Sequence, residues 1–179
     1  MGTQSDLLVG LAGAVGNVDF ETVYQTELPR IYNFFRYRVG DDQIAEDLTA
    51  ETFEKAWKHR EQYRQDLASF STWLFIIARR LAADHFRKRR PIVSLEEARR
   101  LADPQVLEEE AQERADFRRL SALLARLAER ERELVALKFG AGLTNRAIAR
   151  ISGLTESNVS TILHRLIRQL RAQLEKDYE

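Results

Sequence analysis

Hydrogen-bonding side chains gather on one side of the segment 156–168. They are Glu156, Ser157, Ser160, Thr161, His164, Arg165 and Arg168. An apolar stripe with spacings of three and four lies on the other side, at Val159, Ile162, Leu163, Leu166, Leu170 and Leu174. This periodicity predicts a helix with one buried face. The polar face of such a helix can enter the major groove of duplex DNA, where side-chain donors and acceptors read base edges.

A shorter helix is predicted immediately before this one. Thr144 can cap its N-terminus, and Ile148 and Ile151 recur on its inner side. Gly153 allows the left-handed backbone that ends a helix, and Thr155 can cap the next one. Two helices joined by so short a turn form either an ordinary hairpin with a solvated outer face or a DNA-binding helix-turn-helix. The small inward residues and the polar outer face favour the DNA-binding motif.

Aromatic and basic residues occur together in the segment 69–90. It contains Trp73, Phe75 and Phe86, and residues 79–90 hold six Arg or Lys against one Asp. Aromatic faces stack on unpaired bases and cations follow the phosphates, so this composition suits single-stranded nucleic acid. Taken alone, the segment is better explained by aromatic core residues beside a solvated basic helix end.

An acidic face is predicted on a helix over residues 43–59. Asp47, Glu51 and Glu54 share one side of it, while an apolar stripe occupies another. An acidic face of this kind docks on a basic partner or is simply solvated, and by itself the pattern favours the solvated interpretation.

Helical periodicity dominates the chain, and strand alternation is nearly absent. Other helices are expected over 19–38, with a kink or break near Pro29, and from Ser71 or Thr72 to Pro91. In the C-terminal part of the chain, the residues expected to face inward include Leu134, Leu137 and Phe139. We therefore predict an all-α protein of two small helical domains joined by a flexible acidic linker. The predicted divisions are a tail at 1–16, a domain at 17–90, the linker at 91–111 and a helix-turn-helix domain at 112–176.

Composition limits the classes of function. The 179 residues are 44% hydrophobic and 31% charged with a net charge of zero, which fits a soluble protein with real cores. With no cysteine and three scattered histidines, neither disulfides nor a thiolate metal site is expected. The apolar run near the start is short and lacks a basic flank, so neither a signal peptide nor membrane insertion is expected. We expect a cytoplasmic protein.

Taken together, these segments resemble a known family. The runs DDQIAEDLTAETFEKAWKH, FSTWLFIIARRLAADHFRKRR, LAERERELVALKF and LTNRAIARISGLTESNVSTILHRLIRQLR look like bacterial sigma factors of the extracytoplasmic-function (ECF) group, in the sigma-70 family. The resemblance runs from about Phe20 to Leu174 and keeps the order and spacing of a sigma2-like and a sigma4-like domain. It implies a subunit that binds core RNA polymerase, recognises promoters and promotes DNA melting.

The resemblance also implies roles for individual residues. Core polymerase, through the clamp coiled coil of its β′ subunit, would bind Asp47, Leu48, Glu51, Phe53 and Trp57. The −10 element, captured as a melted single strand with one base flipped out, would bind Tyr63, Phe70, Trp73, Arg79, Arg80, His85, Arg87 and Lys88. The −35 element, read as duplex, would bind Thr144, Glu156, Ser157, Asn158, Ser160, Thr161, His164, Arg165 and Arg168. The β flap of polymerase and an anti-sigma factor are the other partners that the family implies.

Three positions depart from the family's usual pattern. Ala50 replaces a glutamine, Arg80 replaces a frequent asparagine and Ala128 replaces a proline. The first would remove a polar contact to polymerase, and the second would exchange a base contact for a phosphate contact. The third would lengthen a helix.

Two other functions compete with this interpretation. A conventional repressor or activator would explain the helix-turn-helix but not the basic aromatic helix followed by an acidic linker. An all-helical enzyme could hold Mg²⁺ with Asp41, Asp42, Glu46 and Asp47, yet the first two stand where helix caps are expected. We expect no catalytic residue, metal site or cofactor.

Overall fold

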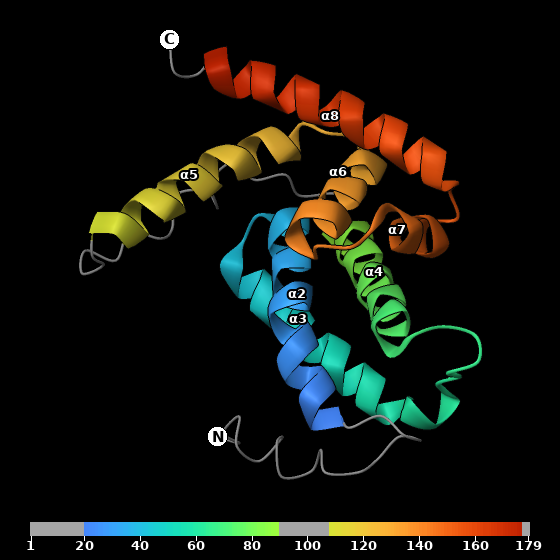
Figure 1. Ribbon diagram of the computed structural model, residues 1–179. Coiled ribbons are helices and arrows are strands. Elements are labelled where there is room, and N and C mark those ends of the chain that lie inside the picture. Colours follow the sequence, from blue (N-terminus) through green and yellow to red (C-terminus); the bar gives the residue numbers. More distant parts are fainter. Residues whose placement is uncertain (1–19, 90–107, 177–179) are drawn as a thin grey trace.

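The protein is described by a computed structural model that places residues 20–89 and 108–176 (Figure 1). The described residues form helices and turns and no strand, which confirms the all-α prediction. The N-terminal domain contains α2 (Phe20–Val39), α3 (Asp42–Lys58), the 3-10 turn η1 (Arg60–Gln62) and α4 (Phe70–Arg89). The C-terminal domain contains α5 (Glu108–Ala125), α6 (Glu129–Val135), the π-helical turn η3 (Ala136–Gly140), α7 (Asn145–Ser152) and α8 (Glu156–Lys176).

The three long helices of the N-terminal domain pack around large apolar side chains. Ile31, Phe34 and Phe35 of α2 and Phe75 of α4 are fully buried. The Asp41 carboxylate accepts a hydrogen bond from the Ile44 amide at 2.8 Å and so caps α3. Helix starts and buried stripes in this domain therefore follow the sequence pattern.

The predicted break near Pro29 is wrong, because α2 is continuous from Phe20 to Val39. Proline removes one amide donor, which leaves the carbonyl of Gln25 without its helical partner. Both Pro29 and Gln25 are on the exposed side of α2, where water can satisfy that carbonyl. The helix therefore continues because its buried side is undisturbed.

The helix-turn-helix forms as predicted. Thr144 accepts a hydrogen bond from the Ala147 amide at 3.2 Å and caps α7, and Thr155 accepts one from the Asn158 amide at 3.2 Å and caps α8. Between them Gly153 has a φ of 71°, the left-handed conformation that glycine adopts readily. Val159, Leu163 and Leu166 of α8 are buried, so the predicted stripe faces the core.

The π-helical turn η3 continues α6 with wider hydrogen-bond spacing. The Ala141 amide donates to the Ala136 carbonyl at 2.9 Å, so five residues separate the bonded groups instead of four. Leu137 is buried, whereas Phe139 points outward with 48% of its surface exposed. The prediction that Phe139 faces inward is wrong, because two residues along a helix turn the side chain by about 200°, to the side opposite Leu137.

The two domains pack directly against each other. One continuous apolar cluster runs from Phe20 and Phe34 in the N-terminal domain to Leu137 and Ile148 in the C-terminal domain. Gly140 lies close to the N-terminal domain, because an added Cβ there would be 2.7 Å from the Asn33 carbonyl oxygen. In Figure 1, α6, η3 and α7 lie between α8 and the N-terminal helices.

The structure describes only the end of the predicted linker. Helix α5 begins at Glu108, so residues 108–111 are helical. The predicted tail at 1–16 and the linker residues 91–107 lie outside the described residues.

Candidate nucleic-acid interface

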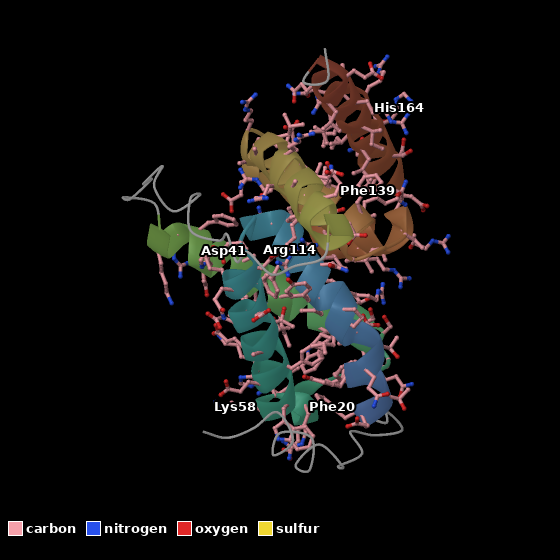
Figure 2. The ribbon with its side chains drawn as sticks, turned by 90° about the vertical axis from the view of Figure 1, so that its left-hand side faces the viewer. Phe20, Asp41, Lys58, Arg114, Phe139 and His164 are labelled. Carbon is pink, nitrogen blue, oxygen red and sulfur yellow. The ribbon has the colours of Figure 1, made fainter. Side chains whose placement is uncertain are left out.

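The polar face of α8 is open to solvent. The predicted duplex-reading residues Glu156, Ser157, Asn158, Ser160, Thr161, His164, Arg165 and Arg168 are all exposed, as is Thr144 on the preceding turn. Figure 2 shows His164 at the end of the molecule opposite Phe20 and Lys58. A rigid helix anchored by a buried stripe therefore presents this face without obstruction from the N-terminal domain.

Ion pairs restrain two residues of this face. Arg165 donates to the Glu131 carboxylate of α6 at 2.5 Å, and Glu156 lies 3.9 Å from the Arg146 guanidinium. The Arg165 side chain keeps 61% exposure, so its remaining donors can reach a phosphate or a guanine edge.

An aromatic cluster forms where α4 begins. The ring centroids of Tyr63, Phe70 and Trp73 lie between 5.1 and 5.4 Å from one another, and Phe20 lies 5.7 Å from Phe70. Phe70 is buried, whereas Tyr63 and Trp73 are half-buried. Burial raises the pKa of the Tyr63 phenol above its ordinary value, and its hydroxyl donates to the Ala68 carbonyl at 3.1 Å. These residues therefore serve the core as well as any ligand.

The loop before α4 is held by its own polar groups. Arg64 donates to both Asp66 oxygens, at 2.9 and 2.7 Å, and this contact lowers the pKa of the Asp66 carboxyl. Ser69 accepts from the Thr72 amide at 3.2 Å and caps α4. Leu67 projects from the loop with 74% exposure. The loop is thus ordered beside the aromatic cluster and offers an apolar tip.

Arg79 is the basic residue of α4 that reaches the C-terminal domain. Its Nε and Nη2 atoms donate to the two carboxylate oxygens of Glu133 on α6 at 2.8 and 3.0 Å. Its Nη1 atom donates to the Ile151 carbonyl at the end of α7. Arg79 is therefore held by the other domain in this structure.

The remaining predicted strand-binding residues lie along the rest of α4. Arg80, Arg87 and Lys88 are exposed, and Arg87 pairs with Asp84 at 2.9 Å. The His85 ring stands edge-on to Phe86, with centroids 5.5 Å apart. These cations are accessible to a phosphate backbone.

Two arginines of α2 also reach the C-terminal domain, and the sequence reasoning missed them. Arg38 is 2% exposed and donates to the carbonyl oxygen of Glu129 at 3.3 Å. Arg30 donates from Nε to the Ala141 carbonyl at 2.9 Å. The one available signal was that Arg38 continues the buried series of Ile31, Phe34 and Phe35, where an apolar residue is expected.

The acidic face of α3 divides into exposed and buried positions. Asp47 is exposed and accepts from Gln43 at 3.4 Å, while Glu51 pairs with Lys55 at 3.1 Å. Leu48 and Phe53 are buried at 7% and 6% exposure, and Trp57 packs edge-on against Phe20. Of the five residues predicted to dock, Asp47, Glu51 and part of Trp57 are open to a partner.

Two of the four carboxylates considered for magnesium have structural partners. Asp41 caps α3, and Asp42 accepts from Arg36 at 2.8 Å and from the Tyr32 hydroxyl at 3.3 Å. Their positions are accounted for by helix capping and ion pairing.

No helix among the described residues combines the length and the apolar character that crossing a membrane requires.

Comparisons with known proteins place both domains. Residues 23–92 match the family model for sigma-70 region 2, and residues 123–172 match the one for sigma-70 region 4. The ECF RNA polymerase sigma factor BldN of Streptomyces coelicolor is 31% identical over 166 residues, which cover 88% of this chain and 61% of BldN. The chain thus spans less than two thirds of that relative. The ECF sigma factor SigX of Bacillus subtilis is 29% identical over 163 residues, covering 87% of this chain and 84% of SigX.

A solved structure shares the fold. The sigma factor RpoE of Bartonella quintana, crystallised with the anti-sigma factor NepR, superposes with a TM-score of 0.67 at 22% identity. The alignment covers 88% of this chain and 97% of that one.

Proposed function

Because the chain belongs to the sigma-70 family as a sigma factor of the ECF group, we propose that it is a promoter-specificity subunit of RNA polymerase. It binds core polymerase, recognises −35 and −10 elements and promotes DNA melting for transcription initiation. It works in the cytoplasm and has no catalysis of its own. The observation that carries this proposal is the pairing, in one chain, of a helix whose exposed polar face suits duplex DNA with an aromatic and basic surface suited to an unpaired strand.

The −35 element is read by the exposed face of α8, with Arg165 and Arg168 on phosphates or guanines. Thr144 contributes through the α7 cap more than through a DNA contact, because its hydroxyl is already bonded to the Ala147 amide. The −10 strand is captured by the cluster at the start of α4, where Tyr63 and Trp73 keep partly exposed rings. Extruding a base costs a few kcal/mol of stacking, which such rings offset.

Core polymerase docks on α3, which supplies an acidic face to the clamp coiled coil of β′. Asp47, Glu51 and part of Trp57 make the contact, while the buried Leu48 and Phe53 hold the helix in place. The C-terminal domain contacts the β flap, and an anti-sigma factor binds the free protein, as NepR binds the sigma factor RpoE of Bartonella quintana.

Run-off transcription tests the function as a whole. Purified chain is added to core polymerase on its own upstream DNA and on a genomic library, and promoter-directed transcripts are expected only when both proteins are present. A conventional repressor would instead bind its operator tightly without polymerase. Absence of any directed transcript would reject the sigma-factor function.

Charge reversal tests the docking face. Asp47→Lys with Glu51→Lys should abolish binding to core polymerase, because both carboxylates would then repel a basic coiled coil. Binding of the isolated variant to duplex −35 DNA should be unchanged, since α8 lies in the other domain. Unimpaired core binding would remove α3 from the interface.

A further inference from the structure

Cations of the N-terminal domain face acceptors of the C-terminal domain. Arg30 donates to the Ala141 carbonyl, Arg38 to Glu129 and Arg79 to Glu133. All three guanidinium groups come from α2 and α4, and all three acceptors come from the segment that starts at α6. Arg38 and Arg79 thus meet carboxylates across the interface, whereas Arg30 meets a neutral carbonyl there and pairs with Glu27 of its own helix at 2.8 Å.

The contact between Arg79 and Glu133 has the geometry of phosphate recognition. Two parallel hydrogen bonds of 2.8 and 3.0 Å join the guanidinium to both carboxylate oxygens. Arginine binds two phosphate oxygens through the same planar fork. Glu133 therefore binds the Arg79 guanidinium with the geometry that a phosphate of a nucleic-acid strand would use.

Arg38 is incompletely satisfied by the carboxylate it meets. Its hydrogen bonds to the carbonyl and the carboxylate of Glu129 are long, at 3.3 and 3.5 Å. Within the described residues its Nε atom has no hydrogen-bond partner, although the side chain is buried. Burial lowers the pKa of Arg38 while the nearby Glu133 charge opposes that shift. A buried cation with an unused donor destabilises the closed interface. The Arg38 Nε atom can donate to another ligand when the domains separate.

An aromatic ring lies beside these cations. The Arg38 guanidinium stands 4.8 Å from the centroid of Phe86, which is itself half-buried. Arginines together with an aromatic face are the groups with which proteins hold unpaired strands. Aromatic rings that can stack on bases also gather at the start of α4. The arginines and Phe86 therefore extend the surface proposed for the −10 strand.

We propose that Arg30, Arg38, Arg79 and Phe86 form a second part of the single-strand surface, here called the covered cationic face. In the closed protein Glu129 and Glu133 occupy it as substitutes for phosphates. Melted promoter DNA and the acidic side of α6 compete for these arginines, so strand binding and separation of the domains are coupled. This inference rests on the proposed function, because it supposes that an unpaired strand is the ligand.

Gly140 offers a way to separate the domains without altering a charge. An alanine Cβ there would lie 2.7 Å from the Asn33 carbonyl oxygen and 3.2 Å from the Phe34 Cα, both backbone atoms that cannot move aside cheaply. Gly140→Ala should therefore weaken the closed state. Glu133→Gln weakens it by a different route, because it removes the charge that holds Arg79.

Interdomain distances show whether these variants open the protein. The chain has no cysteine, so spin labels can be attached cleanly at Gln62→Cys and Gln169→Cys, two exposed positions in different domains. The labelled chain without further substitution should give a narrow distribution of interdomain distances. Adding Gly140→Ala or Glu133→Gln should broaden this distribution and shift it to longer distances. Adding an unlabelled single-stranded DNA of randomised sequence to the background should shift it in the same direction, since coupling is reciprocal.

Strand affinity identifies the ligand of the covered cationic face. Binding of a fluorescent single strand of randomised sequence is measured by anisotropy over a series of salt concentrations. Gly140→Ala should bind it several times more tightly than the unaltered chain. Adding Arg38→Gln to Gly140→Ala should reverse most of that gain and lower the slope of log affinity against log salt by about 0.7, the value for one lost phosphate contact. Arg126→Gln, at an exposed arginine in the turn that follows α5, is the matched control and should leave affinity nearly unchanged.

Several results would overturn the inference. If Arg38→Gln changes neither affinity nor salt slope in the opened variant, Arg38 is a structural residue of the interface. If it weakens binding to core polymerase and leaves strand binding intact, the face belongs to a protein partner. If neither opening variant lengthens the distances or raises affinity, Glu133 does not compete with the strand. Run-off transcription by the unaltered chain separates these failures from failure of the proposed function.

Discussion

The two surfaces proposed to meet promoter DNA are built in different ways. On α8 the buried stripe of Val159, Leu163 and Leu166 is separate from the polar face that meets solvent. At the start of α4 the same side chains serve both purposes: Phe70 is buried, and Trp73 packs against it with one side open. Arg79, farther along α4, is held by the other domain.

The difference follows from the two forms of DNA. Duplex DNA already displays its base edges in the groove, so a rigid helix can read them from an exposed face. An unpaired base must be received in a pocket, and a pocket needs walls drawn from the core. We therefore expect that stability and recognition can be separated by mutation on α8 but not at the start of α4.

Truncation of Phe70 should have the largest effect. Phe70→Ala removes a buried ring that contacts Phe20, Tyr63 and Trp73, and a loss of about 3–5 kcal/mol in unfolding free energy is expected. Thr161→Ala on the exposed face of α8 should change stability by less than about 0.5 kcal/mol. Urea unfolding followed by circular dichroism measures both. A loss below that of Thr161→Ala would show that the aromatic cluster is not part of the core.

Replacement of Arg165 should have the next largest effect. It should lower the affinity for −35 DNA and leave stability unchanged. Arg165→Ala is expected to weaken −35 binding by the polymerase complex by about 1–3 kcal/mol if the guanidinium reads a base. Electrophoretic mobility with single-base promoter variants distinguishes this from a phosphate contact, which would weaken all sequences equally. Arg171→Ala, on an exposed position of the same helix, is the control. Equal losses for both variants would mean that only general charge matters.

Loss of the α8 cap should lower the free energy of unfolding by an intermediate amount. Thr155→Ala removes the acceptor for the Asn158 amide and should cost about 1 kcal/mol of stability. Thr155→Ser keeps the hydroxyl and should retain most of it. Thermal unfolding compares the three proteins. If alanine and serine behave alike, the hydroxyl is not the source of the cap's contribution.

Acid should have the smallest and most local effect, in the loop beside the aromatic cluster. The pKa of Asp66 is lowered by its hydrogen bonds from Arg64, so this pair supports the folded loop above the pKa of the unfolded carboxyl, about 3.9. The support is lost as pH falls through the lower folded value. Carboxyl chemical shifts in the unaltered chain and in Arg64→Ala report the pKa directly. An unchanged Asp66 pKa in Arg64→Ala would show that the pair does not form in solution.

Local features of the fold were predictable from the sequence. Thr144, Gly153 and Thr155 set the boundaries of α7 and α8 through bonds within a few residues, and the apolar spacing of α8 identified its buried side. Pro29 misled the prediction because its effect depends on which side of α2 it occupies. The prediction for Phe139 was wrong because this residue follows the buried Leu137 by two positions, which on a helix is the opposite side.

The sequence by itself determined that two helical units exist, where the helix-turn-helix begins and ends, and which residue types could meet DNA. Capping and periodicity act over one or two turns, so they can be read from neighbouring residues. Only the tertiary structure decided which of those groups are accessible to DNA and which are held by the other domain. Arg79 and Glu133 are 54 residues apart, and their contact depends on how α6 and η3 pack against α2 and α4. Gly140 matters only because the Asn33 carbonyl lies beside it. Contacts of this kind depend on the packing of whole faces, which local spacing does not specify.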